Sequence, residues 1–213
     1  MRHEYKGRFI TFEGGEGSGK STQVALLTDY LNKRGIQAIK TREPGGSSGA
    51  EDIRALLLKG GSDRWDGMTE VLLHSAARRD HLVKTVWPSL EQGMWVVCDR
   101  FFDSTLAYQG WGHGIDLHSI AVAIGLSAGT FKPDLTLILD MDVTQGLERA
   151  KGRGQGQDRY ESMDVSFHER LRQGFVDIAR AEPERCALID AGQTPDQVHQ
   201  AVVERVEAQW LRN

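Results

Sequence analysis

The chain contains 213 residues, of which 39% are hydrophobic and 26% are charged, a composition that is typical of one globular domain and excludes a disordered chain. With 26 basic against 30 acidic residues the formal net charge is −4, which excludes the overall basic surface expected of a nucleic-acid-binding protein. The sequence has no run of 18 apolar residues, so no helix is expected to span a membrane.

The N-terminal segment, residues 1–8, is charged and lacks an apolar run, so it does not resemble a secretory signal. A strand is predicted over 8–13 and a helix over 20–33, whose apolar side chains fall on one face. A second strand is predicted over 37–41. The next helix covers 69–92, where Pro88 should break or kink it. The apolar side chains of this helix that are expected to face the core are Leu72, Leu73, Ala76 and Val83.

Three further strands and a last helix are predicted in the rest of the chain. The strands cover 94–99, 135–140 and 186–190, and their continuous apolar runs indicate burial on both faces. The first and the third contain the two cysteines, so we expect buried thiols in a reducing, cytoplasmic location. The last helix follows a cap at Thr194, and its apolar residues form one stripe that should belong to the core: Val198, Val202, Val206 and Trp210.

Strands that alternate with helices in this way indicate a three-layer α/β fold with a five-stranded parallel sheet. No repeat or change of composition divides the chain, so residues 1–213 are predicted to form a single domain. In such a sheet the ligand binds outside the carboxyl ends of the strands. Four of the predicted strands end in an acidic residue, which places polar chemistry at that edge: Glu13, Asp99, Asp140 and Asp190.

A glycine-rich loop joins the first strand to the first helix. Its residues match the phosphate-loop pattern G-x-x-x-x-G-K-[ST] in the required strand–loop–helix context. Glycines allow successive backbone N–H groups to point at phosphates, and the positive end of the helix dipole adds to their field. The nucleotide-binding residues predicted here are Gly14, Gly15, Glu16, Gly17, Ser18, Gly19, Lys20, Ser21 and Thr22.

The same loop predicts a magnesium-bound nucleoside triphosphate. Lys20 should reach the β- and γ-phosphates, and the hydroxyl of Ser21 should ligate Mg²⁺. Asp99 ends a buried strand and is the best candidate for the acidic partner near the metal. The alternative is that Asp99 only caps the next helix.

The class of nucleotide-binding protein is narrowed by what the chain lacks. A GTPase should carry the motif Asn-Lys-x-Asp, whereas the Asn-Lys pair at 32–33 is followed by Arg-Gly. A motor or transporter ATPase would normally need a longer chain. Arginine-bearing helices and a basic, glycine-rich segment in a chain of this size favour a kinase that acts on a small anionic acceptor.

Several motifs together resemble those of thymidylate kinases. The resemblance spans residues 8 to about 200 and includes the loop at 12–22, Thr-Arg-Glu-Pro-Gly-Gly at 41–46, and Asp-Arg-Phe with Ala-Tyr-Gln-Gly within 99–110. It implies a P-loop nucleoside monophosphate kinase fold, transfer of the γ-phosphate of ATP to dTMP in dTTP biosynthesis, and a homodimer. The acceptor phosphate is already a nucleophile, so catalysis should come from positioning and charge neutralisation.

The resemblance also assigns residues to the acceptor site. Arg78 and Arg100 would hold the dTMP phosphate, and Glu16 would contact the 3′-hydroxyl or Mg²⁺. Arg42, Glu43 and Pro44 would form a wall near the sugar and the acceptor phosphate. Gln109 is not assigned, since it could be a helix-surface residue. The residues expected to line the pyrimidine and sugar are His74, Ser104, Thr105 and Tyr108, and the catalytic set is Lys20, Arg153, Glu16 and Arg100.

A basic segment at approximately 146–161 resembles the lid of the family. Within 149–159 there are four cations and one acid, which by composition alone would equally describe a solvated flexible loop. By resemblance it is the bacterial type of lid, in which Arg153 is the catalytic cation and Arg149 lies near the adenine or its phosphates. Tyr160 would then touch the acceptor, and Glu161 the metal.

One position departs from the family pattern. Family members usually place a Phe that stacks on thymine four residues before the helix arginine, where this chain has His74. An imidazole can stack but could titrate near neutral pH, so we expect dTMP binding to weaken as His74 is protonated between pH 5.5 and 8. Two alternative functions remain open from the sequence: a kinase for dUMP, UMP or CMP, and a nucleotide-binding regulator without turnover.

Overall fold

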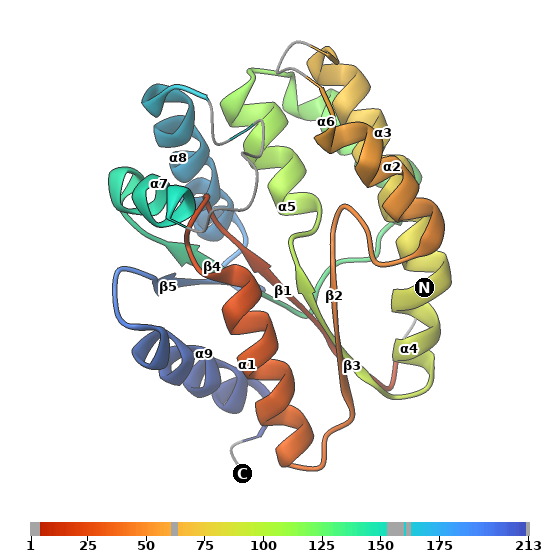
Figure 1. The fold of residues 1–213 in the computed structure, drawn as a ribbon. Coiled ribbons are helices and arrows are strands. Elements are labelled where there is room, and N and C mark those ends of the chain that lie inside the picture. The colour runs from red at the N-terminus through yellow and green to blue at the C-terminus, as the bar shows by residue number, and fades with distance from the viewer. Residues whose placement is uncertain (1–4, 61–63, 153–159, 161–162, 212–213) are drawn as a thin grey trace.

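The computed structural model describes residues 5–60, 64–152, 160 and 163–211. Five parallel strands form one sheet in the order β2-β3-β1-β4-β5 (Figure 1). The predicted α/β fold with a five-stranded parallel sheet is therefore confirmed. Each strand lies within two residues of its predicted range: β1 (Phe9–Glu13), β2 (Ala38–Arg42), β3 (Trp95–Asp99), β4 (Leu135–Asp140) and β5 (Cys186–Asp190).

Helices cover both faces of the sheet. On one face α1 (Lys20–Lys33) and α9 (Pro195–Trp210) lie side by side (Figure 1). Successive residues of a strand point to opposite faces, so Ile10 and Phe12 pack toward these two helices, whereas Phe9 packs toward the other face. The remaining α-helices are α2 (Ser48–Leu58), α3 (Gly67–His81), α4 (Trp87–Glu91), α5 (Phe102–Thr105), α6 (Leu117–Ala128), α7 (Val143–Lys151) and α8 (Val165–Ala181).

Two stretches of wider π-helical turns extend helices on this second face. Leu82–Val86 joins α3 to α4, and Leu106–Gly112 continues α5. The predicted break at Pro88 is confirmed, because the α-helical pattern is interrupted directly before it and Pro88 lies in the first turn of α4. Proline has no N–H, so the α-helical hydrogen bond to the carbonyl oxygen of Lys84 cannot form, and its ring displaces that carbonyl.

The predicted core face of the 69–92 helix is wrong. Leu72 is 55% exposed and Val83 is 45% exposed, whereas Arg78 and His81 are almost fully buried. The helix packs between α2 and α6, and the face that it buries mixes Val71 and Ala77 with the polar Arg78 and His81. Hydrophobic periodicity selects the wrong face here because the buried face is partly polar.

Two other predictions about the core are confirmed. Val198, Val202 and Val206 of α9 belong to the cluster under α1, with Trp210 packed against it. Cys98 and Cys186 are buried free thiols. Within the described part of the chain, no helix combines the length and apolar character needed to cross a bilayer.

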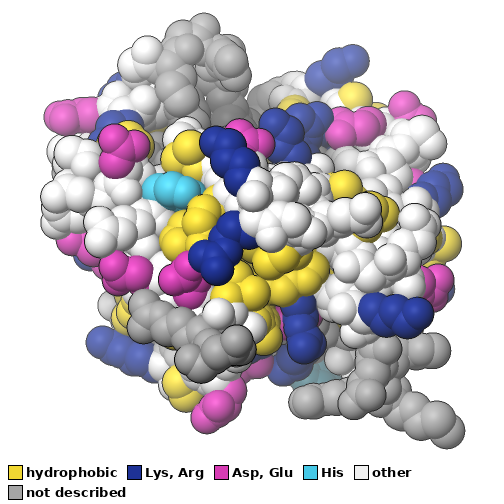
Figure 2. Space-filling view, turned by 90° about the horizontal axis from the view of Figure 1, so that it is seen from below, with side chains coloured by type: hydrophobic (Ala, Val, Ile, Leu, Met, Phe, Trp, Pro, Cys, Tyr) yellow, Lys and Arg dark blue, Asp and Glu magenta, His cyan; other side chains and the backbone are white. Residues whose placement is uncertain are grey.

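The surface in Figure 2 gathers hydrophobic side chains near the centre of the face and carries charges of both signs around them. Acidic and basic side chains are interspersed there, and the described residues of this face form no continuous basic surface. Such a distribution gives no electrostatic footprint for a nucleic-acid backbone on this face.

Candidate active site

The phosphate loop leaves β1 and enters α1 at the carboxyl edge of the sheet. Gly14 has φ 133° and Gly17 has φ 70°, values that side-chain-bearing residues rarely adopt. A Cβ on Gly17 would lie 1.9 Å from the carbonyl oxygen of Gly146 in α7. The loop is therefore packed against α7, and its curl depends on glycine at these positions.

Lys20 is the first residue of α1 and is almost completely buried. Its Nζ donates hydrogen bonds to the carbonyl oxygens of Gly14 (3.0 Å) and Gly15 (2.7 Å) and lies 3.3 Å from Oγ of Ser18. Burial, and next to it the positive charge of Arg100, lower the pKa of Lys20 to about 8. The ammonium is thus held inside the loop, where a phosphate would favour its charged form.

Ser21 and Asp99 meet beside this ammonium. The Ser21 hydroxyl donates to Oδ2 of Asp99 over 2.5 Å. The alternative role of Asp99, as the cap of the next helix, is not what the structure shows: the residue preceding α5 is Phe101, and no side chain caps that helix. Asp99 instead faces the phosphate loop from the end of β3.

Arg100 follows Asp99, and its side chain lies against the phosphate loop. Its Nη2 pairs with Oε1 of Glu16 (2.9 Å), and its Nη1 donates to the Gly14 carbonyl (3.2 Å) and to Oγ of Ser104 (3.1 Å). The guanidinium lies over the ring of Tyr108, whose hydroxyl also donates to Glu16. Among the described non-glycine residues Arg100 alone has a positive φ, 69°. Such backbone geometry concentrates at functional sites, where the surroundings enforce it.

The four acidic residues that end strands lie at one edge of the sheet, as predicted, but they have different partners. Asp140 forms an ion pair with Arg172, and Asp190 accepts hydrogen bonds from its own turn. Glu13 is fully buried beneath the loop, where burial and Asp103 raise its pKa to about 8. Its carboxyl group accepts from the Phe101 amide (2.7 Å) and the hydroxyl of Ser104 (2.5 Å). Parallel strand ends do share an edge, but ion pairs and turns use most of these carboxylates structurally.

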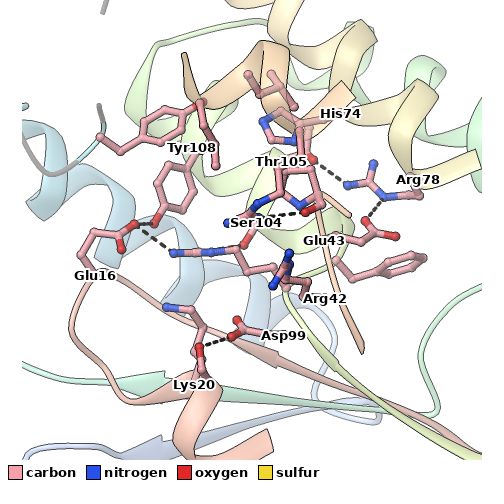
Figure 3. A pocket seen from close by; sticks show the side chains of 18 of the residues that line it. Glu16, Lys20, Arg42, Glu43, His74, Arg78, Asp99, Ser104, Thr105 and Tyr108 are labelled. Carbon is pink, nitrogen blue, oxygen red and sulfur yellow. Dashed lines mark hydrogen bonds and ion pairs between the residues drawn. The ribbon is translucent and has the colours of Figure 1, made fainter. Parts of the chain in front are cut away.

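A cavity of about 480 Å³ opens beside the loop (Figure 3). It is bordered by Lys20, Ser21 and Asp99 at one end and by side chains of α2, α3 and α5 at the other. Every residue predicted to contact the acceptor lines it: Glu16, Arg42, Glu43, Pro44, His74, Arg78, Arg100, Ser104, Thr105, Tyr108 and Tyr160. The structure brings these residues together from five separate segments of the chain.

Arg78 lies across the cavity from Lys20 (Figure 3) and is 2% exposed. Its Nε donates to Oε2 of Glu43 and its Nη2 to Oγ1 of Thr105, both over 2.9 Å. Its Nη1 is buried and has no hydrogen-bond partner among the described residues. A buried guanidinium nitrogen without a partner is unfavourable unless a ligand supplies an acceptor.

His74 is held neutral in this cavity. Burial, followed by the positive charges of Arg78, Arg100 and Arg54, lowers its pKa to about 3. The expected titration of His74 near neutral pH is therefore wrong. The reason is that the imidazole faces a ring of arginines, which the residue type and its helical spacing do not reveal.

We consequently predict that His74 contributes no pH dependence to dTMP affinity from pH 5.5 to 8, because a pKa of about 3 leaves it neutral over this whole window. The test is calorimetric titration of dTMP into the native protein and into His74→Phe at several pH values. The ratio of the two dissociation constants should stay constant, since the titration of the acceptor phosphate cancels in it. A native affinity that falls relative to the variant below pH 6.5 would contradict this.

Comparison with known proteins identifies the family that has this site. Residues 12–202 match the family model for thymidylate kinase. The thymidylate kinase of Caulobacter vibrioides is 52% identical over 92% of this chain and 94% of its own length. The chain belongs to the thymidylate kinase family. It uses ATP to phosphorylate dTMP to dTDP.

Two further comparisons agree. The thymidylate kinase of Alkalilimnicola ehrlichii is 47% identical over 97% of this chain and 96% of its own length. The crystal structure of thymidylate kinase from Ehrlichia chaffeensis is 40% identical and superposes with a TM-score of 0.77, covering 94% of this chain and 98% of that chain. The family is thus shown by sequence and by fold.

Two residues that line the cavity of this thymidylate kinase, Gln109 and Arg54, were not assigned to the site from the sequence. Gln109 is 1% exposed, and its Nε2 donates to Glu70 (3.0 Å) and to the hydroxyl of Tyr160 (3.1 Å), so a helix-surface position is excluded. Arg54 of α2 lines the cavity and donates to the carbonyl oxygen of Pro44 (2.8 Å). Its helix α2 was not predicted, so nothing pointed to Arg54. Gln109 lies within a motif of the family, which was the available signal.

Only some of the residues predicted to bind ATP and magnesium lie within the described part of the chain. Arg149 donates to the carbonyl oxygen of Ala191 (3.1 Å) and lines a second cavity of about 500 Å³ with Gly19, Thr22 and Thr194. The described start of the predicted lid, residues 146–151, belongs to helix α7. Arg153 and Glu161 lie outside the described residues, so their roles as catalytic cation and metal ligand stay predictions.

Proposed function

We propose that the phosphates of ATP bind in the loop at 14–22, that dTMP occupies the adjoining cavity, and that the phosphoryl group passes between them beside Arg100. The observation that carries this proposal is the placement of three cations along one cavity: Lys20 at the loop, Arg100 between the Gly14 carbonyl and Ser104, and Arg78 across the cavity from Lys20 (Figure 3). Two polyanions that must touch need such cations between them, because their mutual repulsion would otherwise dominate the barrier.

The acceptor end of the site supports this assignment. The phosphate of dTMP offers several oxygen acceptors, and Nη1 of Arg78 is a buried donor without a partner among the described residues. Nη2 of Arg100 pairs with Glu16, whereas Nη1 donates to the Gly14 carbonyl. The guanidinium can therefore bind Glu16 and a phosphate through different nitrogens. With the phosphate oriented in this way no protein base is required, and in-line transfer depends on alignment and charge neutralisation.

We also propose a magnesium ion at Ser21 and Asp99. A hydroxyl and a carboxylate that lie 2.5 Å apart beside the phosphate loop are hard oxygen donors of the kind Mg²⁺ prefers. No group of three or more His, Cys, Asp or Glu that could hold a metal occurs among the described residues. That fits an ion held mostly by phosphate oxygens and water. When bound, Mg²⁺ would neutralise phosphate charge, while Ser21 and Asp99 hold it at the loop.

Other parts of the assignment rest on the resemblance alone. These are the bacterial type of lid with its basic residues, the homodimer, the cytoplasmic location and the place in dTTP biosynthesis, and each remains a prediction. Membership of the thymidylate kinase family argues against dUMP, UMP and CMP as acceptors. It also argues against a regulator without turnover.

The acceptor assignment is tested with Arg78→Lys. Lysine keeps the positive charge beside the buried Glu43 but cannot reproduce the guanidinium fork, so we expect the KM for dTMP to rise about ten-fold or more while the KM for ATP stays nearly unchanged. Arg79→Lys is the matched control, because Arg79 is exposed and lies over the ring of Trp87 outside the cavity. Equal dTMP constants for both variants would contradict the proposal.

A further inference from the structure

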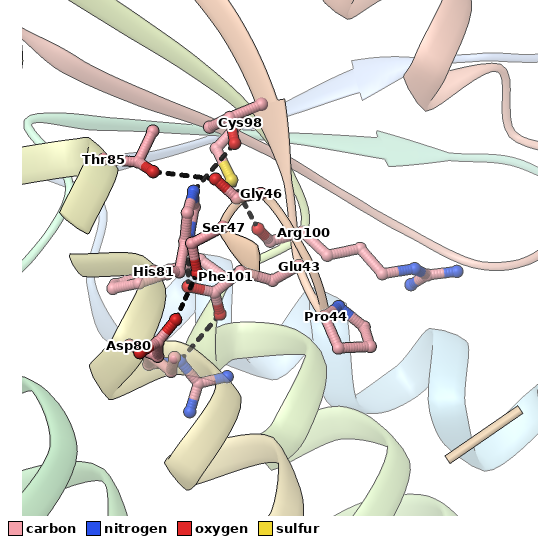
Figure 4. Close-up of polar contacts among 12 residues, drawn as sticks. Glu43, Pro44, Gly46, Ser47, Asp80, His81, Thr85, Cys98, Arg100 and Phe101 are labelled. Atoms are coloured by element: carbon pink, nitrogen blue, oxygen red, sulfur yellow. Dashed lines mark hydrogen bonds and ion pairs between the residues drawn. The ribbon is translucent and has the colours of Figure 1, made fainter. Parts of the chain in front are cut away.

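His81 is a completely buried histidine that does not line the cavity. It ends α3, three residues after Arg78, and is 0% exposed. Its Nδ1 lies 3.0 Å from Oε1 of Glu43, and its Nε2 lies 2.7 Å from Oγ1 of Thr41 (Figure 4). A buried ring with both nitrogens engaged is held in one orientation.

The hydrogen-bond partners determine which nitrogen carries the proton toward Glu43. A carboxylate only accepts hydrogen bonds, so Nδ1 of His81 donates to Oε1 of Glu43. In the neutral ring Nε2 then accepts from the hydroxyl of Thr41, which satisfies both nitrogens. The imidazole therefore holds one oxygen of the carboxylate.

The second oxygen of Glu43 holds Arg78. Oε2 accepts from Nε of Arg78 over 2.9 Å, so the carboxylate bridges two residues of the same helix. Thr105 accepts from Nη2 on the other edge of the guanidinium. With Nε and Nη2 both bound, the plane of the guanidinium is set, and Nη1 is the nitrogen left for a ligand.

The loop that carries Glu43 is packed tightly onto His81. A Cβ on Gly46 would lie 2.6 Å from the imidazole ring, and φ at this glycine is 81°. The carbonyl oxygen of Gly46 accepts from the hydroxyl of Thr85, and Ser47 donates to Asp80 (Figure 4). The loop therefore lies against the helix with Gly46 directly beside the imidazole ring.

We propose that His81 is a positioning residue for the acceptor, holding the Glu43 carboxylate so that Arg78 presents its free guanidinium nitrogen to the phosphate of dTMP. This inference rests on the proposed function, in which Arg78 binds that phosphate. It also gives Glu43 a role other than the wall residue that the sequence predicts, because both of its oxygens are occupied by His81 and Arg78.

Two substitutions of His81 separate positioning from packing. The amide nitrogen of His81→Asn lies near the place of Nδ1 and can still donate to Glu43, whereas that of His81→Gln lies near Nε2 and can serve only Thr41. We expect His81→Gln to raise the KM for dTMP about ten-fold, the effect of one lost hydrogen bond to a charged group, with the KM for ATP unchanged. His81→Asn should restore the KM for dTMP to within about three-fold of the native value.

The second measurement is a double-mutant cycle with Arg78→Lys. If His81 acts through Arg78, His81→Gln should add little to the dTMP effect once Arg78 has been replaced. A KM does not depend on the folded fraction of a preparation, so a lower melting temperature would not imitate this result. Thermal unfolding of each variant then measures the packing effect separately.

The outcomes distinguish the inference from the function on which it rests. If Arg78→Lys leaves the KM for dTMP unchanged, the proposed role of Arg78 fails. If Arg78→Lys raises it but His81→Gln does not, only the inference about His81 fails. Equal effects of His81→Asn and His81→Gln on the KM for dTMP would also overturn it, since they would show that donation to Glu43 is irrelevant.

Discussion

Lys20→Met is expected to lower kcat by about 10²–10³-fold, the typical loss when one charge-stabilising donor is removed from a transition state. Lys20 is the cation inside the phosphate loop, and its ammonium is already surrounded by loop carbonyl oxygens that direct it to one place. Methionine keeps much of the length of the side chain but carries no charge. Steady-state kinetics at saturating ATP and dTMP measure the effect.

The fold should survive this change. The pKa of Lys20 is lowered from 10.5 to about 8, so below pH 8 the folded protein holds a charge that is more favourable in the unfolded chain. Removing that charge should therefore leave the free energy of unfolding equal or higher at pH 7, which denaturant titration can measure. A variant that is folded and retains nearly full kcat would contradict the role of Lys20.

The same pKa predicts how native activity depends on pH. In the free enzyme Lys20 loses its proton above about pH 8, so kcat/KM for ATP should fall there. Bound phosphates favour the charged form, so kcat at saturating ATP should hold to a higher pH. If kcat/KM for ATP and kcat at saturating ATP fall at the same alkaline pH, the ammonium of Lys20 is not the group that titrates.

Arg100→Met is expected to lower kcat/KM for dTMP by about 10²–10³-fold. Arg100 lies between the loop and the cavity and pairs with Glu16 (2.9 Å). Removing the guanidinium would take away the proposed ligand of the acceptor phosphate and would leave the Glu16 carboxylate without this cation beside two polyanions. Methionine, like arginine, carries a Cβ. The left-handed backbone at position 100 therefore costs the variant about as much as it costs the native protein.

A conservative variant and a double variant separate the two parts of this effect. Arg100→Lys keeps the charge without the fork, so its kcat/KM should lie between those of the native protein and Arg100→Met. Adding Glu16→Gln to Arg100→Met should recover part of the loss, because the negative charge that faced Arg100 is then gone. If Arg100→Met differs from the native protein by less than about two-fold in kcat/KM for dTMP, Arg100 does not act on the acceptor phosphate.

Features encoded in contiguous segments were predicted well. The phosphate loop is a run of eight residues whose glycine spacing and flanking strand and helix are all visible in the sequence, and the structure places each of them as expected. The valine stripe of α9 depends on a period of 3.6 residues, and it packs into the core. The short strands followed from their apolar runs.

The sequence by itself determined the fold class and the phosphate loop, because these depend on local spacing along the chain. The residues that meet in the cavity were expected from the resemblance to thymidylate kinases. Only the tertiary structure decided that His74 stays neutral, that Gln109 is buried, that α3 turns Arg78 and His81 inward, and that Glu43 holds Arg78. The physical reason is that burial, pKa and hydrogen-bond partners are set by neighbours distant in sequence. Residues 43 and 78 are brought together by packing alone, which no local pattern records.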